Sequence, residues 1–203
     1  MCPSPQMMVG SDAWELRWIA AHLPGLDNAR ETFGSPEPAF NVVDEHDVYL
    51  LGGSNRINLK IRHRENTVKL KRLLERTSDG FERWRTEFDA ALPAGTELVR
   101  EVLDLIGKAG PAERLGAAAN AGEAVGILDT ICDPSQIVSV YKSRRLYQRG
   151  IGTVDEVRFR IDEGHYSSLG VESSSLSELR TLVEDLGLAK LGSPCNYAEF
   201  LVS

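Results

Sequence analysis

Alternating charged and apolar residues, repeated in several short segments, constrain the fold of this chain more than any other feature. The alternation is clearest at residues 57–64, 67–74, 137–147 and 153–162. Successive side chains of a β-strand point to opposite faces, so each segment predicts a strand with one charged face and one apolar face. Only Glu65-Asn66 separates the first two segments, which is typical of a β-hairpin.

The remaining elements also indicate a strand-rich chain. Further alternating segments at 13–19, 42–51 and 166–172 predict strands, whereas an apolar stripe at 96–108 predicts a helix. A second helix is expected to begin near Ser175, which starts a capping-box pattern. Strands outnumber helices and no βαβ repeat is present. The fold class is therefore α+β, either an antiparallel barrel or a strongly curved antiparallel sheet.

Composition and charge narrow the classes of protein further. With 203 residues, 42% of them hydrophobic, the chain suits one globular domain, which we expect at 12–203 after a loose leader at 1–11. The net charge of −7 argues against an extended nucleic-acid surface. Three widely spaced cysteines, no signal-peptide pattern and no apolar run of roughly 18 residues favour a cytoplasmic protein without a membrane segment.

Four of the expected strands carry their basic residues on one face. These residues are Lys60, Arg62 and Arg64, then Lys69 and Lys71, then Lys142 and Arg144, and finally Arg158 and Arg160, which share a face with Glu156 and Asp162. A solvated sheet face gives the same alternation, but it would normally mix both signs, because like charges opposite each other are unfavourable. From the residues alone, an anion-binding site and a solvated face stay open as equal alternatives.

A series of short motifs adds a resemblance to a known family. The motifs are Trp14-Glu15-Leu16-Arg17, Asp47-Val48-Tyr49-Leu50, Leu59-Lys60-Ile61-Arg62, Lys69-Leu70-Lys71, Val140-Tyr141-Lys142-Ser143-Arg144, Val157-Arg158-Phe159-Arg160-Ile161-Asp162, Leu169-Gly170-Val171-Glu172 and Asn196-Tyr197-Ala198-Glu199-Phe200-Leu201. In this order they resemble the CYTH family of triphosphate tunnel proteins over most of the chain.

The resemblance implies a fold, a ligand and a set of site residues. The implied fold is an eight-stranded antiparallel β-barrel with helices packed outside and basic residues inside. The implied partner is a small molecule that contains a triphosphate, and the implied cofactor is Mg²⁺ or Mn²⁺ held by carboxylates, as suits hard cations. The implied phosphate-binding residues are Arg17, Lys60, Arg62, Lys69, Lys71, Lys142, Arg144, Arg158 and Arg160. The implied metal ligands are Glu15, Asp162 and Glu172, of which Glu15 and Glu172 are also the expected catalytic residues.

The sequence departs from the family pattern at three positions. The family's ExExK strand corresponds to Ala13, Glu15 and Arg17, and its later ExE strand corresponds to Gly170 and Glu172. Two acids are therefore missing, and the lysine is an arginine.

The function that the resemblance implies is a metal-dependent hydrolase of inorganic triphosphate, a nucleoside triphosphate or thiamine triphosphate. The missing acids favour an alternative, a non-catalytic polyphosphate- or nucleotide-binding module with a degenerate metal site. Adenylate cyclases also occur in the family, but no residue set in this sequence selects that activity.

Overall fold

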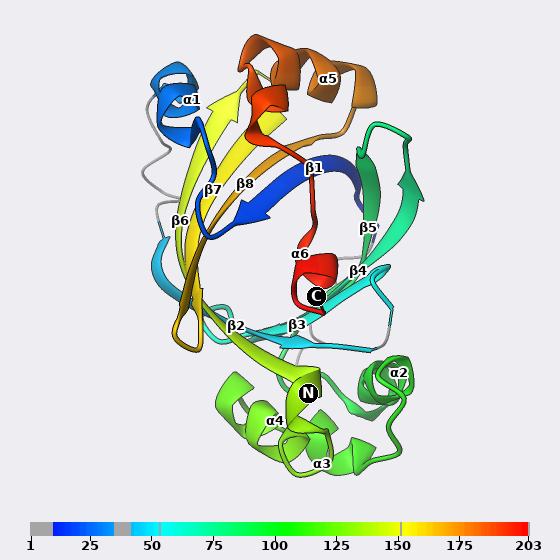
Figure 1. Cartoon of the computed structure of the whole chain (residues 1–203). Coiled ribbons are helices and arrows are strands. Elements are labelled where there is room, and N and C mark those ends of the chain that lie inside the picture. The colour runs from blue at the N-terminus through cyan, green and yellow to red at the C-terminus, as the bar shows by residue number, and fades with distance from the viewer. Residues whose placement is uncertain (1–9, 35–41, 53, 151, 203) are drawn as a thin grey trace.

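The computed structural model describes residues 10–34, 42–52, 54–150 and 152–202. Eight antiparallel strands form a closed barrel in the order β1-β5-β4-β3-β2-β6-β7-β8 (Figure 1). The strands are β1 (Asp12–Ala20), β2 (Val42–Leu50), β3 (Ile57–Arg62), β4 (Thr67–Arg76), β5 (Glu82–Ala91), β6 (Ile137–Arg149), β7 (Gly152–Ile161) and β8 (Gly164–Ser173). The α+β class and the eight-stranded barrel expected from the resemblance are confirmed.

Helices pack around this barrel, except α6, which lies at its interior (Figure 1). They are α1 (Leu26–Phe33), α2 (Thr96–Leu105), α3 (Ala112–Gly116), α4 (Ala121–Leu128), α5 (Leu176–Asp185) and α6 (Tyr197–Phe200), with 3-10 turns η2 (Pro134–Gln136) and η3 (Leu188–Leu191). The two helices predicted from sequence are α2 and α5, and the Ser175 side chain caps α5 by accepting from the Glu178 amide. Among the described helices, none combines the length and the apolar character needed to cross a membrane.

On β1, β3 and β4 the apolar faces point outward, and helices cover them. Figure 1 shows α2, α3 and α4 on one side of the barrel and α1 and α5 on the opposite side. On the first side, Leu59 and Leu70 of the barrel wall pack in one buried cluster with Leu128 of α4. On the second side, Trp18 of β1 packs with Leu179 of α5. Because the apolar faces are buried outside the wall, the charged faces of the same strands point inward.

Apolar side chains fill only part of the barrel interior. Val140, Val157 and Phe159 form a buried cluster there with Tyr49 and with Tyr197 of α6. The α6 helix lies at the interior of the ring of strands, near the C-terminal end of the chain (Figure 1). The remainder of the interior is left for the charged residues.

The strand β5 was not predicted from the sequence. It reads ERWRTEFDAA, in which charged residues at 83, 85, 87 and 89 alternate with uncharged ones at 84, 86, 88 and 90, so the strand pattern was present but was overlooked. The register between β4 and β5 is irregular at Leu70/Lys71 and Leu73/Glu75. Pairing with both β1 and β4 places β5 in the wall.

Candidate functional site

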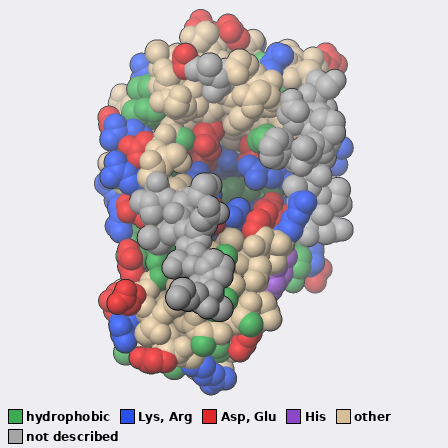
Figure 2. All heavy atoms as spheres, turned by 180° about the vertical axis from the view of Figure 1, so that it is seen from behind, with side chains coloured by type: hydrophobic (Ala, Val, Ile, Leu, Met, Phe, Trp, Pro, Cys, Tyr) green, Lys and Arg blue, Asp and Glu red, His purple; other side chains and the backbone are tan. Residues whose placement is uncertain are grey.

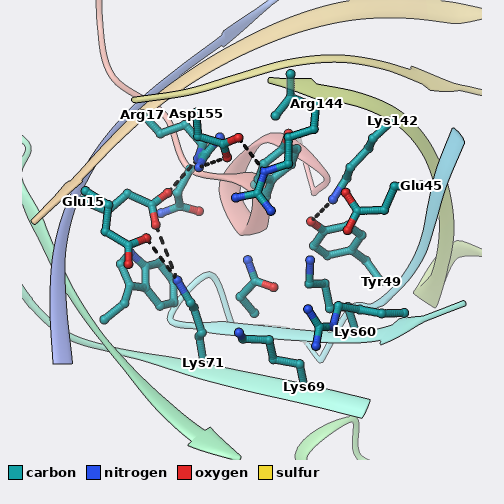
Figure 3. Close-up of a pocket in the computed structure, with 17 residues that line it drawn as sticks. Glu15, Arg17, Glu45, Tyr49, Lys60, Lys69, Lys71, Lys142, Arg144 and Asp155 are labelled. Carbon is teal, nitrogen blue, oxygen red and sulfur yellow. Dashed lines mark hydrogen bonds and ion pairs between the residues drawn. The ribbon is translucent and has the colours of Figure 1, made fainter. Parts of the chain in front are cut away.

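A cavity of about 140 Å³ lies within the barrel, and charged side chains line it (Figure 3). Its cationic residues are Arg17, Lys60, Arg62, Lys69, Lys71, Lys142 and Arg144, and its carboxylates are Glu15, Glu45, Asp155 and Glu172. Cations outnumber carboxylates in this lining by seven to four, although the chain has a net charge of −7. Figure 2 shows a hollow in one face of the molecule with both kinds of charged side chain inside it.

Strand register brings these side chains onto the inner face of the wall. Residues directly opposite one another in an antiparallel pair share a face of the sheet. Lys60 lies opposite both Tyr49 of β2 and Lys69 of β4, while Glu45 of β2 lies opposite Lys142 of β6. The charged faces of β3, β4 and β6 therefore line an enclosed interior and not an open solvated surface.

Asp47 of β2 is fully buried between two lysines. Its Oδ2 accepts hydrogen bonds from Lys60 Nζ and Lys142 Nζ, each at 2.5 Å. Burial alone would raise the pKa of Asp47, but the two ammonium groups outweigh burial and hold that pKa well below its usual value. Burial likewise opposes the charge on Lys142, yet Tyr49 and Asp47 together raise the pKa of Lys142 above its usual value.

Asp155 of β7 holds two arginines in the same way. It accepts from Arg144 Nε at 2.6 Å and from the Arg17 guanidinium at 3.2 Å. Burial would raise the pKa of Asp155, but the two guanidinium groups lower it below its usual value. Arg17 is fixed further by Glu15 at 2.6 Å and by the Ser168 hydroxyl at 2.8 Å.

Asp89 of β5 is the third aspartate of this kind. The Arg62 guanidinium lies 2.8 Å from Asp89 Oδ1, and Lys69 Nζ lies 3.1 Å from Oδ2. Asp47, Asp89 and Asp155 are called the shared aspartates below, because each contacts two cations of the cavity. The groups of Asp47 and Asp89 each keep one net positive charge, whereas Glu15 balances the second cation in the group of Asp155.

The shared aspartates were absent from the site expected from sequence. Asp47 lies in a motif that resembles the family, but its burial between two lysines follows only from the register of β2 with β3 and β6. Asp89 lies in the strand that was not predicted from the sequence. Asp155 lies on the face of β7 opposite to Arg158 and Arg160, and the face with these two arginines was expected from the sequence to point into the interior.

The structure corrects the expected positions of Arg158 and Arg160. Both side chains are exposed, and the Arg160 guanidinium lies 4.8 Å from the ring centre of Tyr141 on the outside of the barrel. The reason is the register of β6 with β7, in which inward-facing Lys142 lies opposite Phe159. The basic face of β7 therefore points outward, and its inner face carries Asp155 and apolar residues.

The expected group of three metal ligands is not brought together either. Glu15 of β1 and Glu172 of β8 lie directly opposite each other in the wall. Asp162 lies instead in the exposed turn after β7, with a φ of 48°. Within the described ranges, no group of three or more acidic, histidine or cysteine side chains is arranged to hold a metal ion. Of the three expected ligands, Glu15 and Glu172 line the cavity and Asp162 does not.

Lys71 lies between these two carboxylates. Its Nζ is 3.8 Å from Glu15 Oε2 and 3.7 Å from Glu172 Oε2, as the dashed lines in Figure 3 indicate for Lys71 and Glu15. Burial would raise the pKa of Glu15, but Arg17 and Lys71 together lower it. The pair therefore provides hard oxygen ligands in a place that already holds a cation, which fits a cation site of the kind that Mg²⁺ uses.

Arg17 accounts for the missing acid at position 170. Arg17 lies directly opposite Gly170 in the register of β1 and β8. A Cβ atom at Gly170 would lie 2.6 Å from Arg17 Cζ, closer than real side chains allow. The arginine and the glycine are therefore a matched pair, since the larger cation occupies the space that a side chain at 170 would need.

Tyr197 of α6 adds a neutral donor to the cavity. Its hydroxyl is buried, and it has no hydrogen-bond partner among the described residues. Burial, partly offset by Lys142 and Arg17, raises the pKa of Tyr197 to about 12. The hydroxyl therefore keeps its proton at neutral pH and is available to donate to an oxygen of a bound anion.

Comparisons with known proteins support the fold. No protein-family model matches the sequence, and no curated protein matches it. A conserved hypothetical protein from Pyrococcus furiosus is 17% identical, with a TM-score of 0.51 over 93% of this chain and 99% of that one. The PH1012 protein of Pyrococcus horikoshii is 13% identical, with a TM-score of 0.51 over 94% and 99% of the two chains.

A third solved structure has a described activity. It is the candidate adenylyl cyclase HpAC1 from Hippeastrum, which is described as showing a dominant triphosphatase activity. It is 12% identical to this chain, with a TM-score of 0.50 over 93% of this chain and 94% of its own. At these identities the similarity shows the fold, and it agrees with the barrel expected from the resemblance to CYTH proteins.

Asp47→Asn should destabilise the protein in a pH-dependent manner. At pH 7 the free energy of unfolding should fall by about 3–5 kcal/mol, because the buried ammonium of Lys142 and the partly buried ammonium of Lys60 lose their shared carboxylate. The folded-state pKa of Asp47 is lowered, so its stabilisation is complete above the unfolded pKa of about 3.9 and is lost as pH falls below that value. Urea denaturation should therefore show that the difference in free energy of unfolding between wild type and variant decreases below about pH 4.

The exposed Asp104→Asn is the control, and it should change the free energy of unfolding by less than about 0.5 kcal/mol. A gap for Asp47→Asn that stays constant from pH 7 to the acid limit would contradict the assigned charge on Asp47.

Gly170→Ala should destabilise the protein by about 1–3 kcal/mol, because the added methyl group meets the Arg17 guanidinium. Gly126→Ala in α4 is the matched control, since a Cβ there meets nothing within 4 Å, and it should be neutral or slightly stabilising. Thermal and urea unfolding measure both effects. Equal stability of the two variants would show that Arg17 does not occupy the space beside residue 170.

Proposed function

We propose that the cavity binds a triphosphate-containing small molecule and that the protein is a metal-dependent triphosphate hydrolase. The observation that carries the proposal is the convergence of seven cations from four strands on one cavity within a closed barrel. Fold similarity to a protein described as a triphosphatase supports triphosphate as the class of ligand.

The pairing of the cations suits them to bind an anion. In the groups of Asp47 and Asp89, two cations share one carboxylate, so one positive charge in each group is available to phosphate oxygens, whereas in the group of Asp155 the second positive charge is paired with Glu15. Arginine donates in a planar fork that matches phosphate, and lysine adds a compact charge. A bound triphosphate would offset the remaining repulsion among the cations, which no carboxylate of the cavity fully neutralises.

The proposed metal side of the cavity is formed by Glu15 and Glu172. Mg²⁺ is usually held by one or two carboxylates together with substrate phosphates and water, so two carboxylates are enough for one ion. Mg²⁺ or Mn²⁺ at that place would supply charge neutralisation and orient the attacking water. The protein side chains would hold the phosphate chain in line, with Arg17 and Arg144 fixed by Asp155.

The alternative function is a binding module without turnover. Alanine at position 13 and glycine at position 170 leave fewer carboxylates than the family pattern has, which favours this alternative. The opposed pair of Glu15 and Glu172 favours the hydrolase. Inorganic triphosphate, nucleoside triphosphates and thiamine triphosphate make up the substrate panel that separates the possible ligands.

Arg144→Ala should weaken triphosphate binding, whereas Arg160→Ala should not. The first change removes a charged contact inside the cavity, which is worth about 1.5–3 kcal/mol, while the second removes an arginine on the outer face of the barrel. Isothermal titration calorimetry with inorganic triphosphate at constant ionic strength measures both affinities. Equal losses in the two variants would show that general surface charge, and not the cavity, attracts the anion.

Glu172→Gln separates the hydrolase from the binding module. For a hydrolase, the variant should largely lose phosphate release with Mg²⁺ or Mn²⁺, while metal-free triphosphate binding should persist or tighten because a repulsive charge is removed. The exposed Glu184→Gln should keep wild-type turnover. Wild-type protein that releases no phosphate across the panel would favour the binding module, and an active Glu172→Gln would refute the proposed metal side.

A further inference from the structure

The position of Lys71 distinguishes it from the other cations of the cavity. Lys60, Lys69 and Lys142 each contact a shared aspartate, whereas Lys71 Nζ contacts Glu15 and Glu172. Its distances to the two carboxylates, 3.8 and 3.7 Å, are longer than those of the other cavity lysines. Among the described residues, Lys71 Nζ therefore has no short hydrogen bond to a carboxylate, and electrostatic attraction keeps it between Glu15 and Glu172.

The ammonium of Lys71 and a divalent cation would need the same carboxylates. Glu15 Oε1 already accepts from Arg17 at 2.6 Å, so Oε2 is the oxygen that faces both Glu172 and Lys71. Two cations a few ångströms apart repel strongly, and salt screens little over such a distance because the Debye length is about 8–10 Å. A metal ion can therefore use this carboxylate pair only when Lys71 has moved away.

We propose that Lys71 is a displaceable internal cation that keeps a divalent metal off Glu15 and Glu172 until an anion draws its ammonium group away. A phosphate group in the cavity offers Lys71 a closer partner than either carboxylate. The freed carboxylates then bind the metal, so anion and metal promote each other's binding, as linkage requires. The competition at the carboxylates stands by itself, and only the coupling to the anion rests on the proposed function.

Lys69 provides the matched control. It lies two residues before Lys71 on the same strand and faces the same cavity, but its Nζ contacts Asp89 at 3.1 Å. Replacing either lysine removes one positive charge from the cavity. Only the replacement of Lys71 removes a positive charge from the place between Glu15 and Glu172.

The test measures Mn²⁺ binding at neutral pH in the absence of any phosphate or sulfate, with the electron paramagnetic resonance signal of free Mn²⁺ as the readout. Lys71→Met should bind Mn²⁺ roughly tenfold or more tightly than wild type, because the competing charge is gone. Lys69→Met and the charge-conserving Lys71→Arg should resemble wild type. Adding Glu172→Gln to Lys71→Met should abolish the gain.

Several outcomes would overturn the proposal. The first is a Mn²⁺ affinity of Lys71→Met equal to that of wild type. The second is an equal gain in Mn²⁺ affinity in Lys69→Met, and the third is a gain in Lys71→Met that persists when Glu172→Gln is added. Circular dichroism and thermal unfolding show whether each variant is folded. If Lys71→Met is unstable, Lys71→Arg still tests the proposal, because tighter Mn²⁺ binding by this charge-conserving variant would contradict competition by charge.

The coupling has its own measurement, with sulfate as a tetrahedral dianion. Excess sulfate should tighten Mn²⁺ binding to wild type several-fold and leave Lys71→Met unchanged, because no ammonium remains to be moved. An equal effect on both proteins, or no effect on wild type, would refute the coupling. Failure of inorganic triphosphate to bind would refute the proposed function, while the anion-free Mn²⁺ result would still decide whether Lys71 competes for the carboxylates.

Discussion

The contact on which the structure depends most is that of each shared aspartate with two cations. Seven cations converge on the interior of this barrel, and their mutual repulsion would otherwise oppose closure of the wall. Asp47 joins β2 to β3 and β6, Asp89 joins β5 to β3 and β4, and Asp155 joins β7 to β1 and β6. The ion pairs therefore link neighbouring and distant strands, so the same contacts that hold the charges also hold the wall.

A charged interior requires an apolar exterior, and this determines where the helices lie. The outward faces of β3 and β4 carry Leu59 and Leu70, which would be exposed without the layer of α2, α3 and α4. The outward faces of β1 and β8 depend in the same way on α5 and on the segments beside it. Hydrophobic burial outside the barrel thus stabilises a wall whose inner face carries the charged side chains.

Much of this fold could be predicted from the sequence, because alternation in β3, β4 and β6 is strong and the hairpin between β3 and β4 is short. Alternation does not tell which face of a strand points inward, and for β7 the basic face was wrongly expected to point inward. Its orientation follows from pairing, since inward-facing Lys142 and Arg144 lie opposite Phe159 and Val157. Asp89 was missed because β5 was not identified, and the irregular register between β4 and β5, which places Asp89 opposite Lys69 and Thr86 opposite Lys71, cannot be derived from alternation.

The departures from the family pattern make more physical sense together than singly. With an arginine at position 17, the cation reaches Asp155 and Ser168 and occupies the space beside Gly170, so a side chain at 170 would require the guanidinium to shift from these contacts. The carboxylates that remain, Glu15 and Glu172, are both in contact with Lys71. A site with fewer acids and an internal cation between them is organised around its anion first. On the proposed competition by Lys71, metal binding in this barrel would follow anion binding, because the anion would release the carboxylates.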